Sequence, residues 1–225
     1  MAKRVISSVP TKMVYESEQN GGRVLVKCWP QLKYDPKYLA RNLRLLAFLQ
    51  KARSLRQSGF NAAPEVLDFG LNTFGLMLVT RWTEGRTLTE WLAASPDGRQ
   101  RALLAHALLN AVRRLHVLGL SHGDVKADNV VVPQTLEGEL PRVVLVDIPD
   151  LSADGDDGIT VGMVPQALES ASPLHRDASA VCALVLTLLP EEFAGTRSDV
   201  ARAIELVDAL PPLDILAETL QDELF

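Results

Sequence analysis

The hydrophobic and polar positions of this chain follow two different periods. Up to about residue 80, short runs rich in β-branched and aromatic residues are separated by turn residues, which predicts β-strands. The strands expected in this part cover residues 5–6, 13–15, 23–27, 64–70 and 76–79. One helix is expected among them, from Asp35-Pro36 to about Gln57, because Asp suits the N-cap and Pro the first helical position.

Beyond residue 88, apolar residues recur at helical spacing instead. The long segment 99–118 places Leu104, Leu108, Ala111 and Leu115 on one face. Further helices are expected at residues 89–93, 178–189, 198–209 and 213–224. Strands followed by helices indicate an α+β fold, with a β-rich N-terminal part and a mainly helical C-terminal part.

Composition limits the classes of protein to consider. The chain has 225 residues, of which 47% are hydrophobic and 23% charged, an ordinary globular balance. The net charge of −5 argues against nucleic acid or a membrane as partner. No apolar run reaches the length of a membrane span, and the cysteines Cys28 and Cys182 are expected as buried thiols. We therefore expect a cytoplasmic protein, and the sequence leaves its oligomeric state open.

Candidate chemistry is concentrated in one stretch and the apolar run after it. Asp124 is followed by Asn129, and Asp147 ends the run Val143-Val144-Leu145-Val146. One carboxylate can take a proton from a hydroxyl, while an amide oxygen and a second carboxylate can hold Mg²⁺. Each residue taken singly fits a polar loop with turn hydrogen bonds equally well. Their order and spacing together favour phosphoryl transfer.

The stretch His122-Gly123-Asp124-Val125-Lys126-Ala127-Asp128-Asn129 resembles the catalytic loop of protein kinases, with Gly123 in place of an arginine. The resemblance implies a bilobal fold, Mg²⁺ and ATP as cofactors, and a protein substrate or regulatory protein as partner. It makes Asp124 the catalytic base and Lys126 a contact of the transferred phosphate. Asn129 and Asp147 would be the metal ligands. Ile148 and Pro149 stand where the family has Phe and Gly.

The N-terminal part carries the matching nucleotide elements. Val24-Leu25-Val26-Lys27 resembles the strand whose lysine contacts the α- and β-phosphates. Thr80 would be the gatekeeper, and the backbone of Arg81, Trp82 and Thr83 would meet adenine. No glycine-rich loop precedes Lys27, so Ser7 and Ser8, expected at a corner, would cover the phosphates. The implied division is an N-lobe at residues 1–80 with five strands and one helix, a hinge at 81–88, and a C-lobe at 89–225.

Some positions depart from the family. No Asp or Glu occurs from Pro36 to Ser58, so the partner of Lys27 is expected to be Asp147, with Glu16 or Glu18 of the N-terminal strands as the alternative, instead of a helix glutamate. Asp177 is expected to begin a helix as its N-cap and to brace the catalytic loop backbone. Gly123 offers no anchor for a phosphate on Thr160, so activity is not expected to depend on that modification. Residues 150–158 are expected to be an acidic activation segment, and Gln166 replaces the glutamate of a structural ion pair.

Three functions remain open at this point. The first is a serine/threonine protein kinase, supported by the complete set of polar residues. The second is a pseudokinase that binds nucleotide or partners, favoured by the missing helix glutamate and glycine-rich loop. The third is a small-molecule kinase of the aminoglycoside or choline type, which Lys126 and the short segment after Asp147 disfavour.

Overall fold

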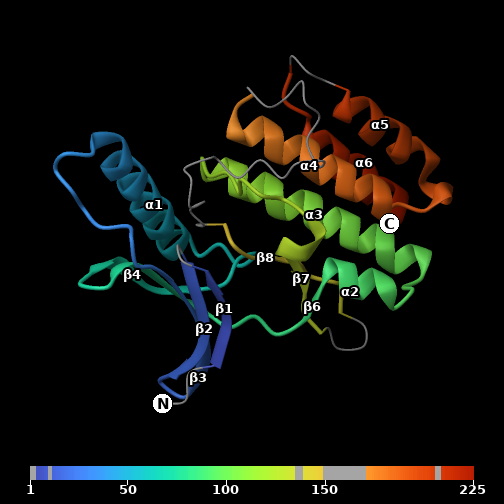
Figure 1. Ribbon diagram of the computed structural model, residues 1–225. Helices are drawn as coiled ribbons and strands as arrows, with labels where there is room; N and C mark the ends of the chain where they lie inside the picture. Colours follow the sequence, from blue (N-terminus) through green and yellow to red (C-terminus); the bar gives the residue numbers. More distant parts are fainter. Residues whose placement is uncertain (1–3, 10–11, 135–138, 149–170, 206–208) are drawn as a thin grey trace. The chain divides into compact units, whose positions relative to one another are not determined.

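The structure is a computed structural model of the 225-residue chain. It describes residues 4–9, 12–134, 139–148, 171–205 and 209–225. The chain divides into two compact units, with the boundary between Thr83 and Glu84 (Figure 1). In the described residues, unit 1 contains a β-sheet and one helix, and unit 2 is mainly helical, in agreement with the expected α+β class. Within the described residues, no helix is long and apolar enough to cross a membrane.

Unit 1 is built on a five-stranded antiparallel sheet with the order β1-β2-β3-β5-β4. Asn20 and Gly21 both have positive φ in the turn between β2 and β3, as a tight hairpin requires. Ser7 and Ser8 lie within β1 and pair with β2, so the expected corner at these residues is wrong. The strands are β1 (Arg4–Val9), β2 (Lys12–Gln19), β3 (Gly22–Trp29), β4 (Val66–Asn72) and β5 (Gly75–Arg81).

The alternation of side chains along β3 gives the sheet two different faces. Val24 and Val26 are buried on one face, where they pack with Val79 of β5. Leu25 and Lys27 therefore point to the opposite face. This face also carries Thr80, which lies opposite Leu25 in the ladder.

The helix of unit 1 is α1 (Leu39–Ser58), and Phe48 on it packs edge-on against Trp29 of β3 at 5.5 Å between ring centroids. The expected start at Asp35 is wrong, because Tyr38 is the N-cap and makes no capping bond through its side chain. Asp35 instead forms a clamp with Asn42: its backbone N–H donates to the Asn42 side chain, which donates back to the Asp35 carbonyl. The Asp35 side chain still accepts from the Lys37 N–H at 3.0 Å, so Asp35 caps the turn that precedes α1 and not the helix itself.

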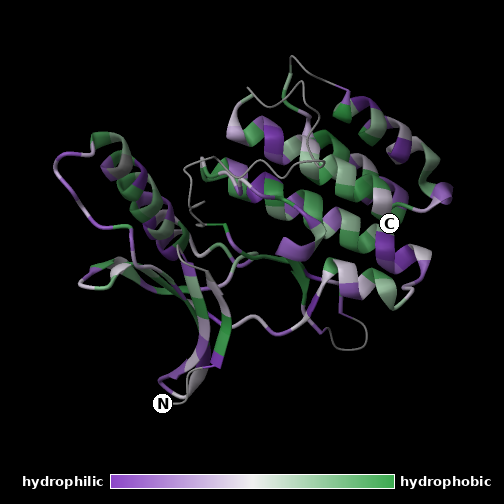
Figure 2. Cartoon of the chain, in the orientation of Figure 1, coloured by the Kyte–Doolittle hydropathy of each residue, from purple (hydrophilic) through white to green (hydrophobic). Residues whose placement is uncertain are grey.

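Unit 2 joins a small sheet to a group of packed helices. The sheet has the order β6-β7-β8, with β6 (Arg86–Thr87), β7 (Val130–Val132) and β8 (Val144–Leu145). The longest helix, α3, packs against α4 and α6, and α4 also packs against α5. Figure 2 shows hydrophobic and hydrophilic residues alternating along these helices. The helices are α2 (Leu88–Ala93), α3 (Gly98–Val117), η1 (Ala127–Asn129), α4 (Pro173–Leu188), η3 (Glu191–Phe193), α5 (Ala194–Ile204) and α6 (Leu213–Leu224).

Two helix starts in unit 2 differ from the sequence expectation. Helix α4 begins at Pro173, with Ser172 as the N-cap whose hydroxyl accepts from the His175 N–H. Asp177 therefore lies inside the helix and caps nothing, contrary to the expectation. Helix α5 begins at Ala194 directly after η3, where only residues from 198 onward were expected to be helical.

Candidate active site

The catalytic-loop residues lie between α3 and β7, and they form a compact cluster. The Lys126 ammonium donates to Asp124 Oδ2 at 2.7 Å, and Asn129 Nδ2 donates to the same oxygen at 2.8 Å. Asn129 Nδ2 also donates to the Asp124 carbonyl at 2.9 Å. The short 3₁₀ turn of η1 brings Asn129 back towards Asp124. The three residues expected from the sequence are thus brought together by local structure.

This geometry makes the two oxygens of Asp124 different. Oδ2 accepts from two donors, one of them charged, which holds the carboxylate in a fixed orientation. Nothing in the described part of the chain donates to Oδ1. The side chain is about one-third exposed, so Oδ1 can accept a proton from a hydroxyl that reaches the loop.

Asp177 of α4 fixes the backbone of the loop. Its carboxylate is 2% exposed and accepts from the backbone N–H groups of both His122 and Gly123, the latter at 2.9 Å. The expected bracing of the loop is confirmed, although Asp177 does so from within the helix. Buried hydrogen bonds to a charged acceptor stabilise by about 1.5–3 kcal/mol each.

His116 is a member of this cluster that the sequence did not single out. Its Nε2 lies 3.4 Å from Asp177 Oδ2. A histidine at the end of an amphipathic helix gives no sequence signal of this role, because its partner lies 61 positions away. Thr89 was missed for the same reason: its hydroxyl donates to Asp128 Oδ1 at 2.7 Å and links α2 to the loop.

The predicted metal ligands Asn129 and Asp147 belong to the same unit and are joined through β7 and β8. The Val146 N–H donates to the Asn129 carbonyl at 2.9 Å, which places the end of β8 beside the loop. Because Asn129 Nδ2 faces Asp124, its amide oxygen is left to face another ligand. Asp147 adopts a left-handed φ of 67°, and Ile148 after it is buried.

An amide and a carboxylate suit Mg²⁺, which keeps several water or phosphate ligands and needs few from the protein. The described residues contain no group of three or more His, Cys, Asp or Glu side chains that could hold a metal ion. A site made by the protein alone is therefore not seen in this part of the chain. The donor set fits a metal that arrives with phosphate oxygens.

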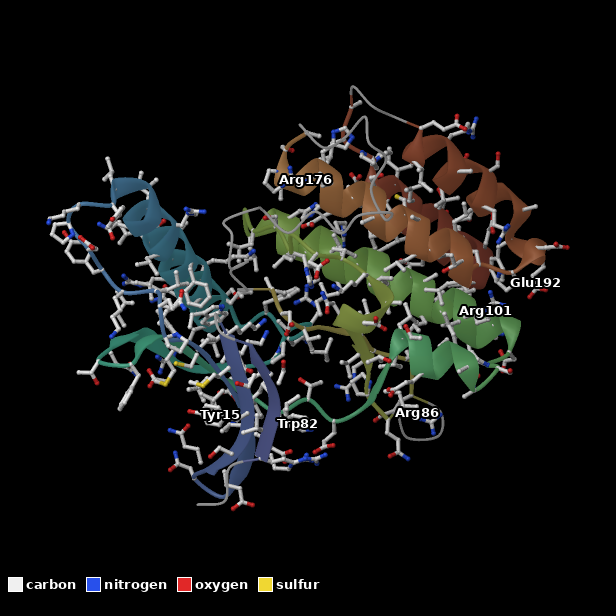
Figure 3. All side chains as sticks on the ribbon, in the orientation of Figure 1. Tyr15, Trp82, Arg86, Arg101, Arg176 and Glu192 are labelled. Atoms are coloured by element: carbon white, nitrogen blue, oxygen red, sulfur yellow. The ribbon has the colours of Figure 1, made fainter. Side chains whose placement is uncertain are left out.

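The residues predicted to bind nucleotide all lie in unit 1. Lys27 is 5% exposed and shares its face of the sheet with Leu25 and Thr80. Trp82, labelled in Figure 3, lies in the segment after β5. This segment is tied to β3, because the Trp82 N–H donates to the Arg23 carbonyl at 3.0 Å and the Arg23 guanidinium lies 4.6 Å from the Trp82 ring centroid. The pairing of Lys27 with Asp147 would join the two units, and it stays a prediction.

The residues predicted to form the hinge differ in whether their backbone N–H groups already have a hydrogen-bond acceptor. The Arg81 N–H donates to the Glu65 carbonyl and the Trp82 N–H to Arg23. The Thr83 N–H has no acceptor among the residues that the structure covers. Of the three residues predicted to form the hinge, Thr83 is therefore the one whose backbone N–H is left to donate.

Charge and burial shift the pKa of several groups. The hydrogen bond from Arg23 lowers the pKa of Glu16 on the Lys27 face of the sheet. Burial raises the pKa of the Cys28 thiol, and it raises the pKa of Cys182 to about 12. Both thiols are free, as expected from the sequence, and burial keeps them protonated.

The expectations for residues 150–158, Thr160 and Gln166, and for Pro149, fall outside the described residues.

The sequence of this chain is similar to those of two kinds of kinase. Residues 41–150 match the lipopolysaccharide kinase (Kdo/WaaP) family. The serine/threonine-protein kinase pkn2 of Myxococcus xanthus is 28% identical over 153 residues, which are 68% of this chain and 17% of that protein. The chain thus corresponds to about a sixth of the length of this relative.

Solved structures of kinase domains have a fold similar to that of this chain. The kinase domain of Mycobacterium tuberculosis PknI, in a cysteine-to-alanine mutant, superposes with a TM-score of 0.68 at 18% identity, covering 98% of this chain and 93% of that domain. The chain is therefore similar in sequence to kinases over part of its length, and it has the fold of a protein kinase domain. Another structure of the PknI kinase domain gives a TM-score of 0.64 at 19% identity over 98% of this chain and 94% of that domain. At this identity the likeness shows the kinase fold alone.

Proposed function

We propose that this kinase-like chain is an ATP-dependent phosphotransferase that moves the γ-phosphate of Mg-ATP to a serine or threonine hydroxyl of a protein. The observation that carries the proposal is the position of Asp124. One of its oxygens is fixed by Lys126 and Asn129, and the other is available to a substrate hydroxyl. Lys126 is the residue type found at this position in the catalytic loop of protein kinases.

In the proposed reaction Asp124 Oδ1 accepts the proton of the attacking hydroxyl. The Lys126 ammonium neutralises negative charge beside the transferred phosphate, and its bond to Asp124 keeps both groups at the same place. Asn129 and Asp147 would hold Mg²⁺, which supplies neutralisation of the nucleotide phosphates. Asp177 keeps the loop in position by holding two of its backbone N–H groups.

Binding of ATP is proposed to use the residues of unit 1. Lys27 would contact the α- and β-phosphates, and Thr80 would line the base pocket on the same face of the sheet. Of the hinge residues Arg81, Trp82 and Thr83, the last would donate from its backbone. Ser7 and Ser8 belong to β1, so their contact with phosphate depends on the edge strand and not on a flexible corner.

A sugar hydroxyl is the second candidate acceptor. The match of residues 41–150 to the lipopolysaccharide kinase family favours it, since this range includes the whole catalytic loop. Asp124 can remove the proton of either acceptor, so the chemistry of the loop is the same for both.

The experiment is a transfer assay with γ-labelled ATP and Mg²⁺, using a protein mixture and purified lipopolysaccharide as separate acceptors. Asp124→Asn is expected to lower transfer at least about a hundredfold, the lower limit for loss of a general base. Asp199→Asn is the matched control, because within the described residues Asp199 pairs only with Arg202 on the same helix, α5. Label on lipopolysaccharide alone would assign the second candidate. Nucleotide binding without transfer to either acceptor would favour a pseudokinase.

A further inference from the structure

Helix α1 carries a second apolar surface, separate from the face that packs on the sheet. Leu45, Phe48 and Ala52 are buried against unit 1. Leu39, Leu43 and Leu46 lie on the other side of the helix and are 70%, 55% and 54% exposed. At 3.6 residues per turn these three side chains fall within an arc of roughly 60°. They form one stripe, which we call the leucine stripe.

The segment before α1 extends this surface. Tyr34 and Tyr38 are both highly exposed and lie directly before the first turn of the helix. The clamp between Asp35 and Asn42 holds this segment against α1. Both tyrosines therefore lie in the exposed segment that leads into the N-terminal end of α1. An exposed patch of this kind on a folded protein marks a docking surface.

The charge of α1 identifies what the surface can dock on. The helix contains five basic residues and no acidic one: Arg41, Arg44, Lys51, Arg53 and Arg56. Among those with described side chains, Arg53 and Arg56 lie to one side of the leucine stripe, with Arg44 and Lys51 to the other. A helix with leucines on one surface, flanking cations and no acids suits an anionic lipid surface.

The rest of the chain carries a net negative charge. The net charge of the whole protein is −5, so the positive charge of α1 is local. Helix α6 offers a direct contrast, because it exposes Ile215 to 59% but carries four acidic residues and no basic one. The net charge suggested no membrane partner, but it averages over surfaces of opposite sign.

We propose that the leucine stripe of α1, with Tyr34 and Tyr38, docks the protein on an anionic membrane surface. The apolar side chains would enter the boundary between headgroups and acyl chains, while Arg44, Lys51 and Arg53 would remain at the anionic headgroups. Docking of this kind would bring the protein to acceptors at a membrane surface.

The test is flotation of the full chain with vesicles of phosphatidylcholine alone and of phosphatidylcholine with about a third phosphatidylglycerol, a share that gives a strong negative surface potential. Binding is expected only to the anionic vesicles and is expected to weaken as salt rises. The variant Leu43→Ser with Leu46→Ser should lose at least about tenfold in vesicle affinity, since each leucine removed takes away apolar burial. Arg53→Glu should also weaken binding.

Two matched control variants test whether loss of vesicle binding is specific to α1 or follows from any change of an exposed apolar or charged side chain. Ile215→Ser removes an equally exposed apolar side chain from the acidic helix α6, and Arg99→Glu reverses an exposed charge on α3. Both should bind vesicles as the parent does.

Four results would overturn the proposal: no binding to anionic vesicles, equal binding to neutral vesicles, an unchanged double leucine variant, or equal loss in the controls. Sedimentation of the chain as a dimer that the leucine variant converts to monomer would identify a second copy as the occupant and also overturn it. None of these measurements requires transfer activity, so failure of the proposed function would leave them interpretable.

Discussion

Replacing Asp177 by alanine tests the physical basis of the catalytic loop. The substitution removes a buried carboxylate that accepts from the His122 and Gly123 N–H groups. Each such bond contributes about 1.5–3 kcal/mol, so two give about 3–6 kcal/mol, a large part of the stability of an ordinary domain. Alanine is favourable within a helix, so the loss is not caused by helix propensity. The thermal midpoint should fall by at least about 6 °C.

The assay is thermal unfolding followed by circular dichroism, together with the transfer assay at a temperature where the variant is folded. Asp199→Ala is the control, since its exposed pair with Arg202 is worth at most about 1 kcal/mol. Transfer should fall in the Asp177 variant because the loop backbone is no longer held. A midpoint unchanged from the parent, or equal losses in both variants, would refute the assignment of Asp177 as the brace.

Three further predictions concern the metal, the thiols and the loop. Asp147→Ala should weaken Mg-nucleotide binding, measured by calorimetry, because it removes an oxygen ligand; equal affinity with and without the substitution would contradict this. Cys28 and Cys182 should not react with a thiol reagent at pH 8 in the folded protein but should react in denaturant, because burial raises both pKa values and excludes the reagent; labelling of the native chain would show otherwise. Phosphatase treatment should leave transfer activity unchanged, because Gly123 has no side chain to bind a phosphate on the activation segment; its loss on treatment would count against this role of Gly123.

The sequence alone determined the type and order of most elements. Alternation and helical spacing are local properties of a chain, so the strands of the sheet and helices such as α3 and α6 could be predicted from them. The cluster around Asp124 was predictable for a similar reason. Asp124, Lys126 and Asn129 lie within six residues, and one short turn is enough to bring them together.

The tertiary structure decided features whose partners are distant in sequence. Asp177 reaches His122 and Gly123 across 55 and 54 positions, and no local pattern shows which backbone groups a buried carboxylate will meet. Helix α1 begins at Leu39 and not at Asp35: the Asp35 side chain accepts from the Lys37 N–H in the turn before the helix, and its backbone bonds to the Asn42 side chain. Helical spacing groups Leu45 with Ala52 and Leu55, and all three are buried, whereas Leu43 is exposed although it has the same hydrophobicity as Leu45. The spacing predicts which residues share a face, but packing in the folded protein is what removes that face from water.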